Sequence, residues 1–158
     1  MSAENGAFCR DAAVSRGLAY GDFDNDGGVD LLVTHVGSRA ALYRNVAPKR
    51  GHWLLVRAID PALHRDAYGA RITVRADGRA FVRWVNPGSS YLCSNDPRAH
   101  FGLGRSTKID VIEVLWPDGR EEDFTGVSID EVLVLREGAG KASPQSEAPA
   151  DNHLEAEK

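Results

Sequence analysis

The sequence predicts an all-β fold: a β-hairpin segment, then a small β-sandwich or barrel-like domain, then a disordered C-terminal tail. Two observations predict this class. Short runs rich in Val, Ile, Leu and aromatic residues recur along the 158-residue chain, and Gly, Pro, Asp or Asn bound each run. Apolar residues nowhere follow the helical period over a window of about 11 residues. Short strands at close intervals are typical of a sandwich or a barrel.

Six runs are predicted to be strands. In chain order they are 31–36, 53–59, 70–74, 80–85, 109–116 and 132–135. The turn chemistry at 116–120, which contains Pro-Asp-Gly, predicts a hairpin at the end of the fifth run.

Composition divides the chain into three parts. A polar break at 47–51 separates a first segment, 1–48, from a second domain, 49–138. The remainder, 139–158, is rich in Ala, Gly, Ser, Pro and charged residues, and Leu154 is its one large apolar residue. Such a segment cannot bury enough apolar surface to offset the entropy of ordering it, so we expect a disordered tail.

A hairpin is also predicted around Asp77 and Gly78. A two-residue turn there would pair Ala76 with Arg79 and would mix apolar and Arg side chains on both faces. A three-residue loop with a left-handed Gly78 pairs Arg75 with Arg79 and yields one apolar face. We therefore predict the three-residue loop.

The chosen register gathers cationic side chains on one face of this hairpin, which is a possible anion-binding face. Its members are Arg71, Arg75, Arg79, Phe81 and Arg83. Like charges directly opposite each other are unfavourable, so anions are expected nearby. They come either from acidic residues of a neighbouring strand (Glu113 or 121–123) or from an external polysaccharide or acidic partner, which Arg would bind through a bidentate fork.

Charge and hydropathy exclude several classes. The chain has 19 Lys and Arg against 23 Asp and Glu, a net charge of −4, unlike a generally basic nucleic-acid binder. No apolar run reaches the roughly 18 residues of a membrane helix. The first 17 residues contain no apolar core of a signal peptide. Cys9 and Cys93 lack the spacing of a zinc or redox motif, and both two free thiols and one disulfide stay open.

No catalytic residue is predicted. The five histidines show no metal-ligand spacing, and the sequence has no nucleophile elbow, phosphate loop or dinucleotide fingerprint. The acidic run 121–123 is interpreted as a solvated strand end. Four aromatic residues are expected in the core, with a sugar-stacking platform as the alternative: Trp53, Trp84, Tyr91 and Trp116.

The Asp loop, residues 21–30, is the most informative stretch, with the sequence Gly-Asp-Phe-Asp-Asn-Asp-Gly-Gly-Val-Asp. Its four carboxylates repel one another unless a cation lies among them, and Gly27 permits a sharp bend. Hard oxygen ligands in this number suit Ca²⁺ better than Zn²⁺ or copper. The predicted ligands are the side chains of Asp22, Asp24, Asp26 and Asp30 and the backbone carbonyl of Gly28.

This calcium loop is not an EF-hand. An EF-hand loop needs a bidentate Glu at its twelfth position, where this chain has Val33, and it needs flanking helices. The run 31–36 is instead a predicted strand. The remaining alternative is a polar Asp/Asn/Gly turn that holds no ion.

Two resemblances follow from these motifs. The stretch 15–21, the Asp loop, 31–34 and 41–45 resemble one FG-GAP (VCBS-type) repeat, the calcium-loop blade of integrin-like β-propellers. The following part resembles the ASPIC/UnbV domain of cartilage acidic protein-like proteins. The matching motifs are Gly51-His52-Trp53-Leu54, Tyr68-Gly69-Ala70-Arg71, Gly88-Ser89-Ser90-Tyr91-Leu92, Asn95-Asp96-Pro97-Arg98, His100-Phe101-Gly102-Leu103-Gly104 and Trp116-Pro117-Asp118-Gly119.

The resemblance implies a non-catalytic, calcium-binding adhesion or recognition module of an extracellular or envelope protein, with a protein or glycan ligand. A carbohydrate-binding module and an accessory domain of a biosynthetic enzyme are the alternatives. Family members carry several blades before this point, so upstream propeller blades of a longer protein are expected partners. The family loop often has Asp where Gly28 stands, a position that supplies backbone oxygen.

Overall fold

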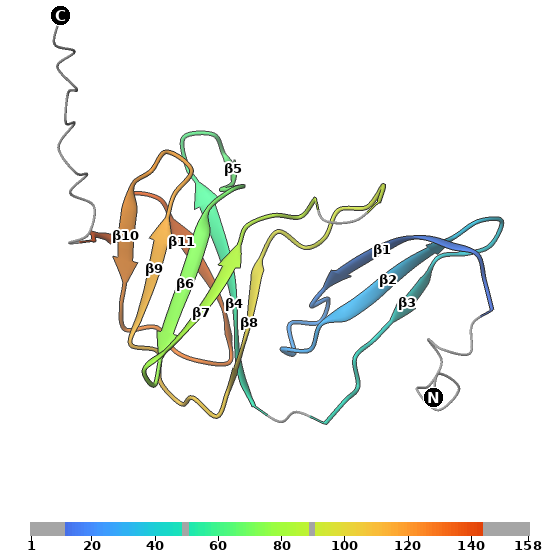
Figure 1. Ribbon diagram of the computed structural model, residues 1–158, viewed down its shortest axis with the longest axis horizontal. Coiled ribbons are helices and arrows are strands. Elements are labelled where there is room, and N and C mark those ends of the chain that lie inside the picture. Colours follow the sequence, from blue (N-terminus) through green and yellow to red (C-terminus); the bar gives the residue numbers. More distant parts are fainter. Residues whose placement is uncertain (1–11, 49–50, 89–90, 144–158) are drawn as a thin grey trace, which may run out of the picture.

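The computed structural model describes residues 12–48, 51–88 and 91–143, and every regular element in these ranges is a β-strand (Figure 1). The predicted all-β class is confirmed. All six predicted runs are strands: β2, β4, β6, β7, β9 and β11. The strands form two parts that lie side by side in Figure 1, a three-stranded sheet and a two-sheet sandwich.

The three-stranded sheet is an antiparallel meander. It contains β1 (Ser15–Gly21), β2 (Asp30–His35) and β3 (Ala41–Tyr43). Leu18 pairs with Val33, and Leu31 pairs with Tyr43, so apolar side chains gather on one face. The Asp loop joins β1 to β2 at one end of this sheet.

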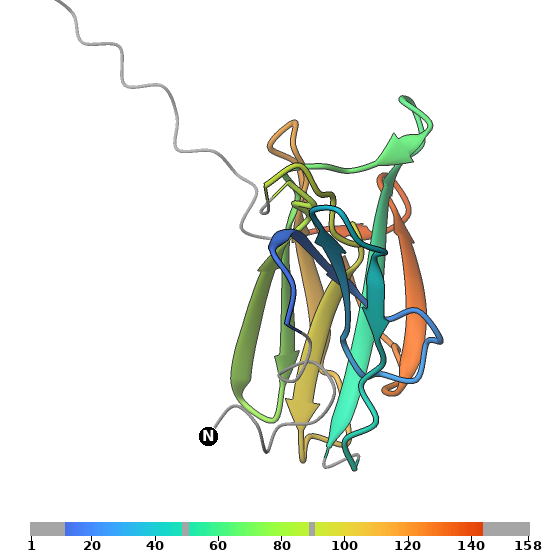
Figure 2. The same ribbon diagram turned by 90° about the vertical axis from the view of Figure 1, so that its right-hand side faces the viewer.

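The sandwich has a five-stranded and a four-stranded sheet. The order of the first is β12 (Lys141–Ala142), β10 (Glu121–Phe124), β9 (Val111–Leu115), β6 (Arg71–Ala76) and β7 (Arg79–Trp84). In the second, β4 (His52–Asp60) pairs with β11 (Glu131–Arg136), β5 (Arg65–Asp66) and β8 (Ala99–Gly104). Figure 2 shows the two layers edge-on, with green β6 and β7 on one side and teal β4 with orange-red β11 on the other.

The core of the protein lies between these two layers. Leu54 on β4, Phe101 on β8, and Ile72 on β6 are fully buried, and Trp116 contributes from the end of β9. The described strands form no closed barrel, so the sandwich is the correct alternative of the two predicted. Trp116 is therefore a core residue as expected, whereas Trp84 and Tyr91 are exposed and the four aromatic residues form no common platform.

The register of the hairpin between β6 and β7 corrects the prediction. Ala76 pairs with Arg79 across a two-residue turn in which both Asp77 (φ 49°) and Gly78 (φ 69°) are left-handed. This turn matches the twist of a hairpin. The three-residue loop was wrong because Ala76 is completely buried and belongs to the core face of β6. The alternation rule had assumed that edge strand β7 also turns Val82 and Trp84 inward, yet both are exposed.

The predicted hairpin at 116–120 is confirmed, and this one does have a three-residue loop. The Trp116 amide donates to the Arg120 carbonyl (2.8 Å), and the Gly119 amide donates to the Trp116 carbonyl (3.0 Å). Pro117 cannot adopt the positive φ of a two-residue turn, so the left-handed residue falls at Gly119 (φ 92°) instead.

The start of the predicted tail also changes. Strand β12 pairs with β10 at the edge of the five-stranded sheet, so the ordered chain continues through Ser143. Glu122 is buried on β10 rather than at a solvated strand end, and its carboxylate accepts the Gly138 (2.8 Å) and Gly140 (3.2 Å) amides. An argument from apolar composition did not detect this ordered segment, because the buried Glu122 carboxylate holds it in place rather than apolar contacts. Residues 144–158 lie outside the described residues, as does Cys9.

Candidate metal site in the Asp loop

The Asp loop is short and sharply curved because two of its residues are left-handed. Asn25 has φ 56° and Gly27 has φ 87°, conformations that Asn and Gly adopt most readily. Both flanking elements are strands, so the EF-hand remains excluded on structure as well as on sequence.

Three of the four predicted carboxylates converge. Asp22, Asp24 and Asp30 each offer an oxygen atom, and these atoms all lie within 4.8 Å of one another. Asp22 and Asp30 are each only 2% exposed, whereas Asp24 is open to solvent. Burying two carboxylates beside a third is unfavourable unless positive charge or hydrogen bonds compensate.

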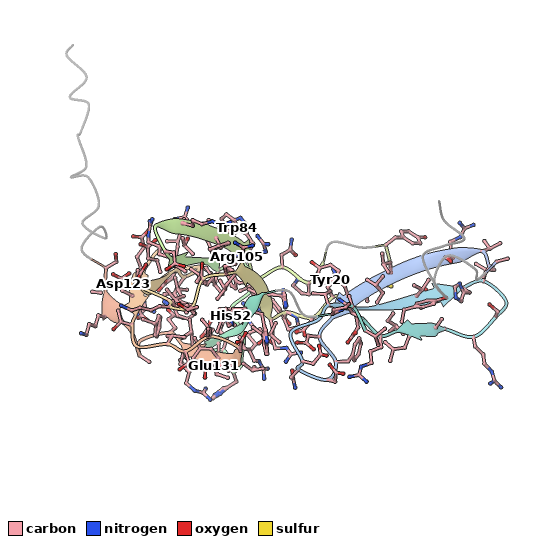
Figure 3. All side chains as sticks on the ribbon, turned by 90° about the horizontal axis from the view of Figure 1, so that it is seen from below. Tyr20, His52, Trp84, Arg105, Asp123 and Glu131 are labelled. Carbon is pink, nitrogen blue, oxygen red and sulfur yellow. The ribbon has the colours of Figure 1, made fainter. Side chains whose placement is uncertain are left out.

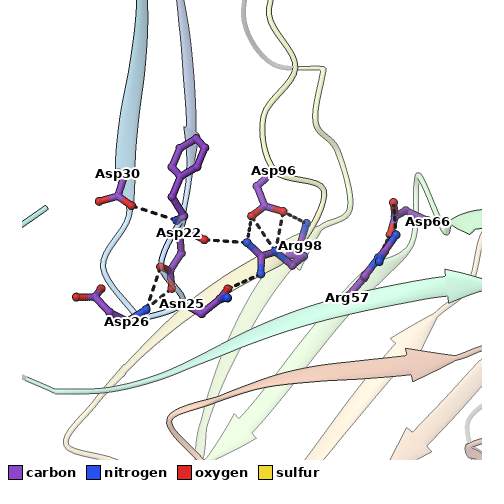
Figure 4. Close-up of polar contacts among 10 residues, drawn as sticks. Asp22, Asn25, Asp26, Asp30, Arg57, Asp66, Asp96 and Arg98 are labelled. Atoms are coloured by element: carbon purple, nitrogen blue, oxygen red, sulfur yellow. Dashed lines mark hydrogen bonds and ion pairs between the residues drawn. The ribbon is translucent and has the colours of Figure 1, made fainter. Parts of the chain in front are cut away.

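Backbone amides supply part of that compensation (Figure 4). The two oxygens of Asp22 accept the Asp26 (3.1 Å) and Gly27 (2.8 Å) amides. Asp30 accepts the Phe23 (3.1 Å) and Asn45 (2.7 Å) amides, which ties the loop to the segment after β3. A carboxylate has about four acceptor positions, so each group retains capacity for a cation.

Asp26 lies outside this group of three. Its Oδ1 accepts the Gly28 amide (2.8 Å), and its Oδ2 lies 4.0 Å from the Arg44 guanidinium. Arg44 also forms an ion pair with Asp24. Arg44 therefore occupies part of the position where a cation would be attracted. Coordination by Asp26 and by the Gly28 carbonyl stays a prediction.

The donor set fits a hard divalent cation. Three converging carboxylates, two of them fixed by backbone amides, provide oxygen ligands on a preformed loop. Ca²⁺ accepts six to eight such oxygens in flexible geometry, whereas Mg²⁺ demands a tighter octahedral shell. The donors are of the kind that Ca²⁺ accepts, and binding of that ion stays a prediction.

The structure adds residues that sequence reasoning had not assigned to the site. They come from the sandwich: Arg98 and His100, at and near the start of β8, and Trp53 on β4. Arg98 donates to the Asp22 carbonyl (2.9 Å) and to Asn25 Oδ1 (2.7 Å), and His100 Nε2 donates to the Gly27 carbonyl (2.9 Å). From the sequence, Arg98 is only part of a short motif, Trp53 is an expected core residue, and His100 lacks metal-ligand spacing.

The possible anion-binding face does not form as predicted, because the corrected register divides it. Arg71 and Arg75 lie on one face of the β6–β7 hairpin, and Arg79, Phe81 and Arg83 lie on the other. Arg75 makes a fork with Glu113 on β9 (2.5 and 3.0 Å), and this hydrogen bonding raises the pKa of the guanidinium above its ordinary value.

On the opposite face, the cations lie over aromatic rings. The Arg79 guanidinium is 4.8 Å from the centre of the Phe81 ring, and that of Arg83 is 5.9 Å from the centre of Phe101. Intramolecular partners therefore account for three of the four Arg residues.

Comparison with known proteins identifies the second part of the chain. A family described as ASPIC and UnbV matches residues 60–142, which is more than half of the chain. Cartilage acidic protein 1 of Xenopus tropicalis is 37% identical over 109 residues, 66% of this chain and 16% of that protein. Its counterparts in mouse and human are each 38% identical over 104 residues, 63% of this chain.

The chain spans about 16% of the length of these relatives. Among the described residues, no helix is long and apolar enough to cross a bilayer. The family match runs from Asp60, the last residue of β4, through β12, and it begins after the Asp loop. The chain belongs to the ASPIC and UnbV family.

Proposed function

We propose that this chain is a non-catalytic, calcium-binding recognition module of an extracellular protein. The observation that carries the proposal is the convergence of the Asp22, Asp24 and Asp30 carboxylates within 4.8 Å on a loop between two strands. The similarity to cartilage acidic protein 1 supports an extracellular setting. The FG-GAP-like sequence pattern of the first part supports calcium.

Bound Ca²⁺ would supply charge neutralisation in the Asp loop. Asp22 and Asp30 would hold it from buried, amide-fixed positions, and Asp24 would complete the carboxylate set from the solvent side. Asp26 and the Gly28 carbonyl are the further candidates for ligands. Arg44 would give up or share its pairing with Asp24, because a divalent cation and the guanidinium compete for that carboxylate.

The recognition surface proposed for this module is the apolar face of the three-stranded sheet. Leu18 and Tyr20 are 41% and 45% exposed, and they lie beside Val33 and Leu31 in the sheet register. A face of this kind is suited to packing against another sheet, and a preceding propeller blade of a longer protein is the partner that we propose. The exposed apolar side chains lie together on one face, and this clustering supports the role, because single exposed apolar residues without a function would be scattered.

Calorimetric titration with Ca²⁺ tests the metal proposal. We expect saturable binding to the wild type and strongly weakened binding to Asp24→Ala, which loses one of the three converging carboxylates. Asp110→Ala is the matched control, because Asp110 is an exposed carboxylate of the sandwich outside the loop, and it should bind as the wild type does. Arg44→Gln should bind more tightly than the wild type, since it removes a competing cation. Absence of binding to the wild type would refute the proposal.

A further inference from the structure

The junction between the three-stranded sheet and the sandwich is built largely on the Asp loop. Hydrogen bonds between described residues link the two parts, and those made by Arg98 and His100 end on loop residues. Others join Tyr20 to the segment before β8: the Tyr20 amide donates to Asn95 Oδ1 (3.1 Å), and the Asp96 amide donates to the Tyr20 carbonyl (3.0 Å). Figure 3 shows Tyr20 at this junction.

Arg98 is the central contact of the junction, and its position is fixed. Asp96 holds the guanidinium through a fork, with Nε–Oδ2 and Nη2–Oδ2 distances of 2.8 and 2.5 Å (Figure 4). The side chains of Arg98 and Asp96 are 22% and 16% exposed, so the pair is largely shielded from solvent. Since Asp96 neutralises Arg98, the guanidinium can approach the loop without opposing a bound cation strongly.

The atoms that Arg98 holds are close to the proposed ligands. It binds the backbone carbonyl of Asp22, a residue whose own carboxylate belongs to the converging group, and the side chain of Asn25, which occupies the left-handed bend. His100 holds the carbonyl of Gly27, whose amide is bound to the Asp22 carboxylate. These contacts fix the curvature of the loop and thereby the spacing of its carboxylates.

Close packing reinforces the same contact. A Cβ atom added at Gly27 would lie 2.4 Å from Cδ1 of Trp53, so the loop backbone rests directly on a side chain of β4. At Gly21, where the loop begins, an added Cβ would lie 2.9 Å from Cβ of Asp96. The loop backbone therefore packs closely against the sandwich at Gly21 and Gly27.

We infer that Arg98 is a positioning residue for the metal site, and that calcium binding and docking of the three-stranded sheet on the sandwich are thermodynamically coupled. This inference rests on the proposed calcium function. Coupling between two events is reciprocal: if the docked sandwich raises the affinity of the loop for Ca²⁺, bound Ca²⁺ tightens the docking by the same factor. Calcium would then set how rigidly the two parts are joined.

Arg98→Lys tests the coupling at constant charge. Lys keeps the positive charge but cannot reproduce the fork that reaches Asp96, Asp22 and Asn25 together. Arg57→Lys is the matched control, because Arg57 forms a similar pair with Asp66 (2.6 Å) within the sandwich and does not touch the loop. Calorimetry should show a Kd for Ca²⁺ raised about tenfold in Arg98→Lys and less than about twofold in Arg57→Lys.

A second variant covers the case in which Arg98→Lys fails to fold. Asn25→Gly keeps the left-handed bend and removes only one acceptor of Arg98, so we expect an intermediate loss of Ca²⁺ affinity, about threefold. Amide hydrogen exchange supplies a readout that affinity alone does not. Ca²⁺ should slow exchange of the Tyr20 and Asp96 amides, which cross the junction, and should leave the core amides of Ile112 and Val74 unchanged.

The outcomes separate the two proposals. If the wild type binds no Ca²⁺, the proposed function fails, and the coupling fails with it. If the wild type binds Ca²⁺ and both Arg98→Lys and Asn25→Gly bind it equally well, the coupling alone is overturned. The coupling alone is also overturned if Ca²⁺ does not slow hydrogen exchange of the Tyr20 and Asp96 amides. Loss of affinity in both Arg98→Lys and Arg57→Lys would likewise overturn it, because the effect would then be a general loss of stability.

Discussion

The two parts of the molecule are stabilised by different means. The sandwich encloses a continuous apolar core that draws on β4, β6, β8, β9 and β11. Within the described residues of the first part, Val33 is the one buried apolar side chain. The buried groups there are otherwise carboxylates and glycines, with Asp22 and Asp30 each 2% exposed. Figure 3 shows the contrast as a dense bundle of side chains beside a thin sheet.

This difference shows where each part is vulnerable. A sheet that buries a single apolar side chain gains little hydrophobic stabilisation, so other contacts are needed to fix it. The first part meets this need through polar contacts at one end, where the Asp loop, Arg98 and His100 meet. The sandwich depends on packing density, and it should be insensitive to metal.

The largest effect is expected from a cavity in the sandwich. Phe101→Ala removes a fully buried ring from the centre of the core and should lower the free energy of unfolding by about 3–5 kcal/mol. Leu42→Ala, at a position 57% exposed in the three-stranded sheet, should change it by less than about 0.5 kcal/mol. Denaturant unfolding measures both, and similar losses for the two variants would contradict the comparison.

The next effect is that of calcium, and it should be confined to the first part and to its junction with the sandwich. At a free concentration of 100 times Kd, Ca²⁺ should add about 2.7 kcal/mol to the stability of the state that binds it. Thermal melting with Ca²⁺, with EDTA and with Mg²⁺ would measure this, and Mg²⁺ should substitute poorly. Asp24→Ala should remove most of the gain. A melting temperature that EDTA does not change, in protein shown to be loaded, would contradict the prediction.

A smaller loss is expected where the two parts touch. Gly27→Ala introduces a Cβ at φ 87° that would meet Trp53 at 2.4 Å. Gly69→Ala is the control, because Gly69 has a similar φ of 94° and nothing within 4 Å of its added Cβ. Both variants place a side chain at a positive φ and bear the same backbone strain. The difference between their losses in free energy of unfolding therefore isolates the packing at the junction, and we expect about 1–3 kcal/mol. Equal losses in denaturant unfolding would show that the loop does not rest on Trp53.

Truncation at two positions should show where the dispensable C-terminal segment begins. Removal of residues 144–158 should change the free energy of unfolding by less than about 0.5 kcal/mol. Removal of 139–158 also deletes β12 and takes the Gly140 amide from the buried Glu122 carboxylate, at a cost of about 1–3 kcal/mol. Identical melting of the two truncated proteins would mean that β12 contributes nothing.

The sequence was informative where one local rule decides the structure. Six apolar runs became strands, and Pro117 with Gly119 defined a hairpin, because strand propensity and turn chemistry act over a few residues. The spacing of the Asp residues likewise predicted four carboxylates that converge, and the structure brings three of them together. In each case the neighbours in the chain are also the neighbours in space.

Local rules failed where a distant element decides. The register at Asp77 depended on whether Ala76 is buried, which β9 and the opposite sheet determine. The contact between Arg98 and Asp22 spans 76 positions, and no short motif specifies it. The signals present were Asn95-Asp96-Pro97-Arg98 and His100, polar residues just before and at the start of a strand, but nothing in the sequence shows what they face.

The smallest effect is expected at the divided Arg face. Arg75 already has a carboxylate partner in Glu113, and Arg79 lies on the opposite face over Phe81, so the two cannot act together on one external anion. Arg75→Lys with Arg79→Lys should therefore leave retention on heparin unchanged at every salt concentration. Stability should also change very little, since salt and solvent screen an exposed pair.

Arg136→Lys serves as the control for general loss of guanidinium groups, because Arg136 is exposed on β11, which belongs to the other sheet of the sandwich. Earlier elution of the double variant alone would restore an external-anion site on the hairpin, despite the observed register. Equal retention of all three proteins would leave the intramolecular partners as the sufficient explanation. The edge of the sandwich would then differ from the three-stranded sheet in one more respect: its Arg side chains meet acidic or aromatic side chains, whereas the buried carboxylates of the Asp loop are held by backbone amides.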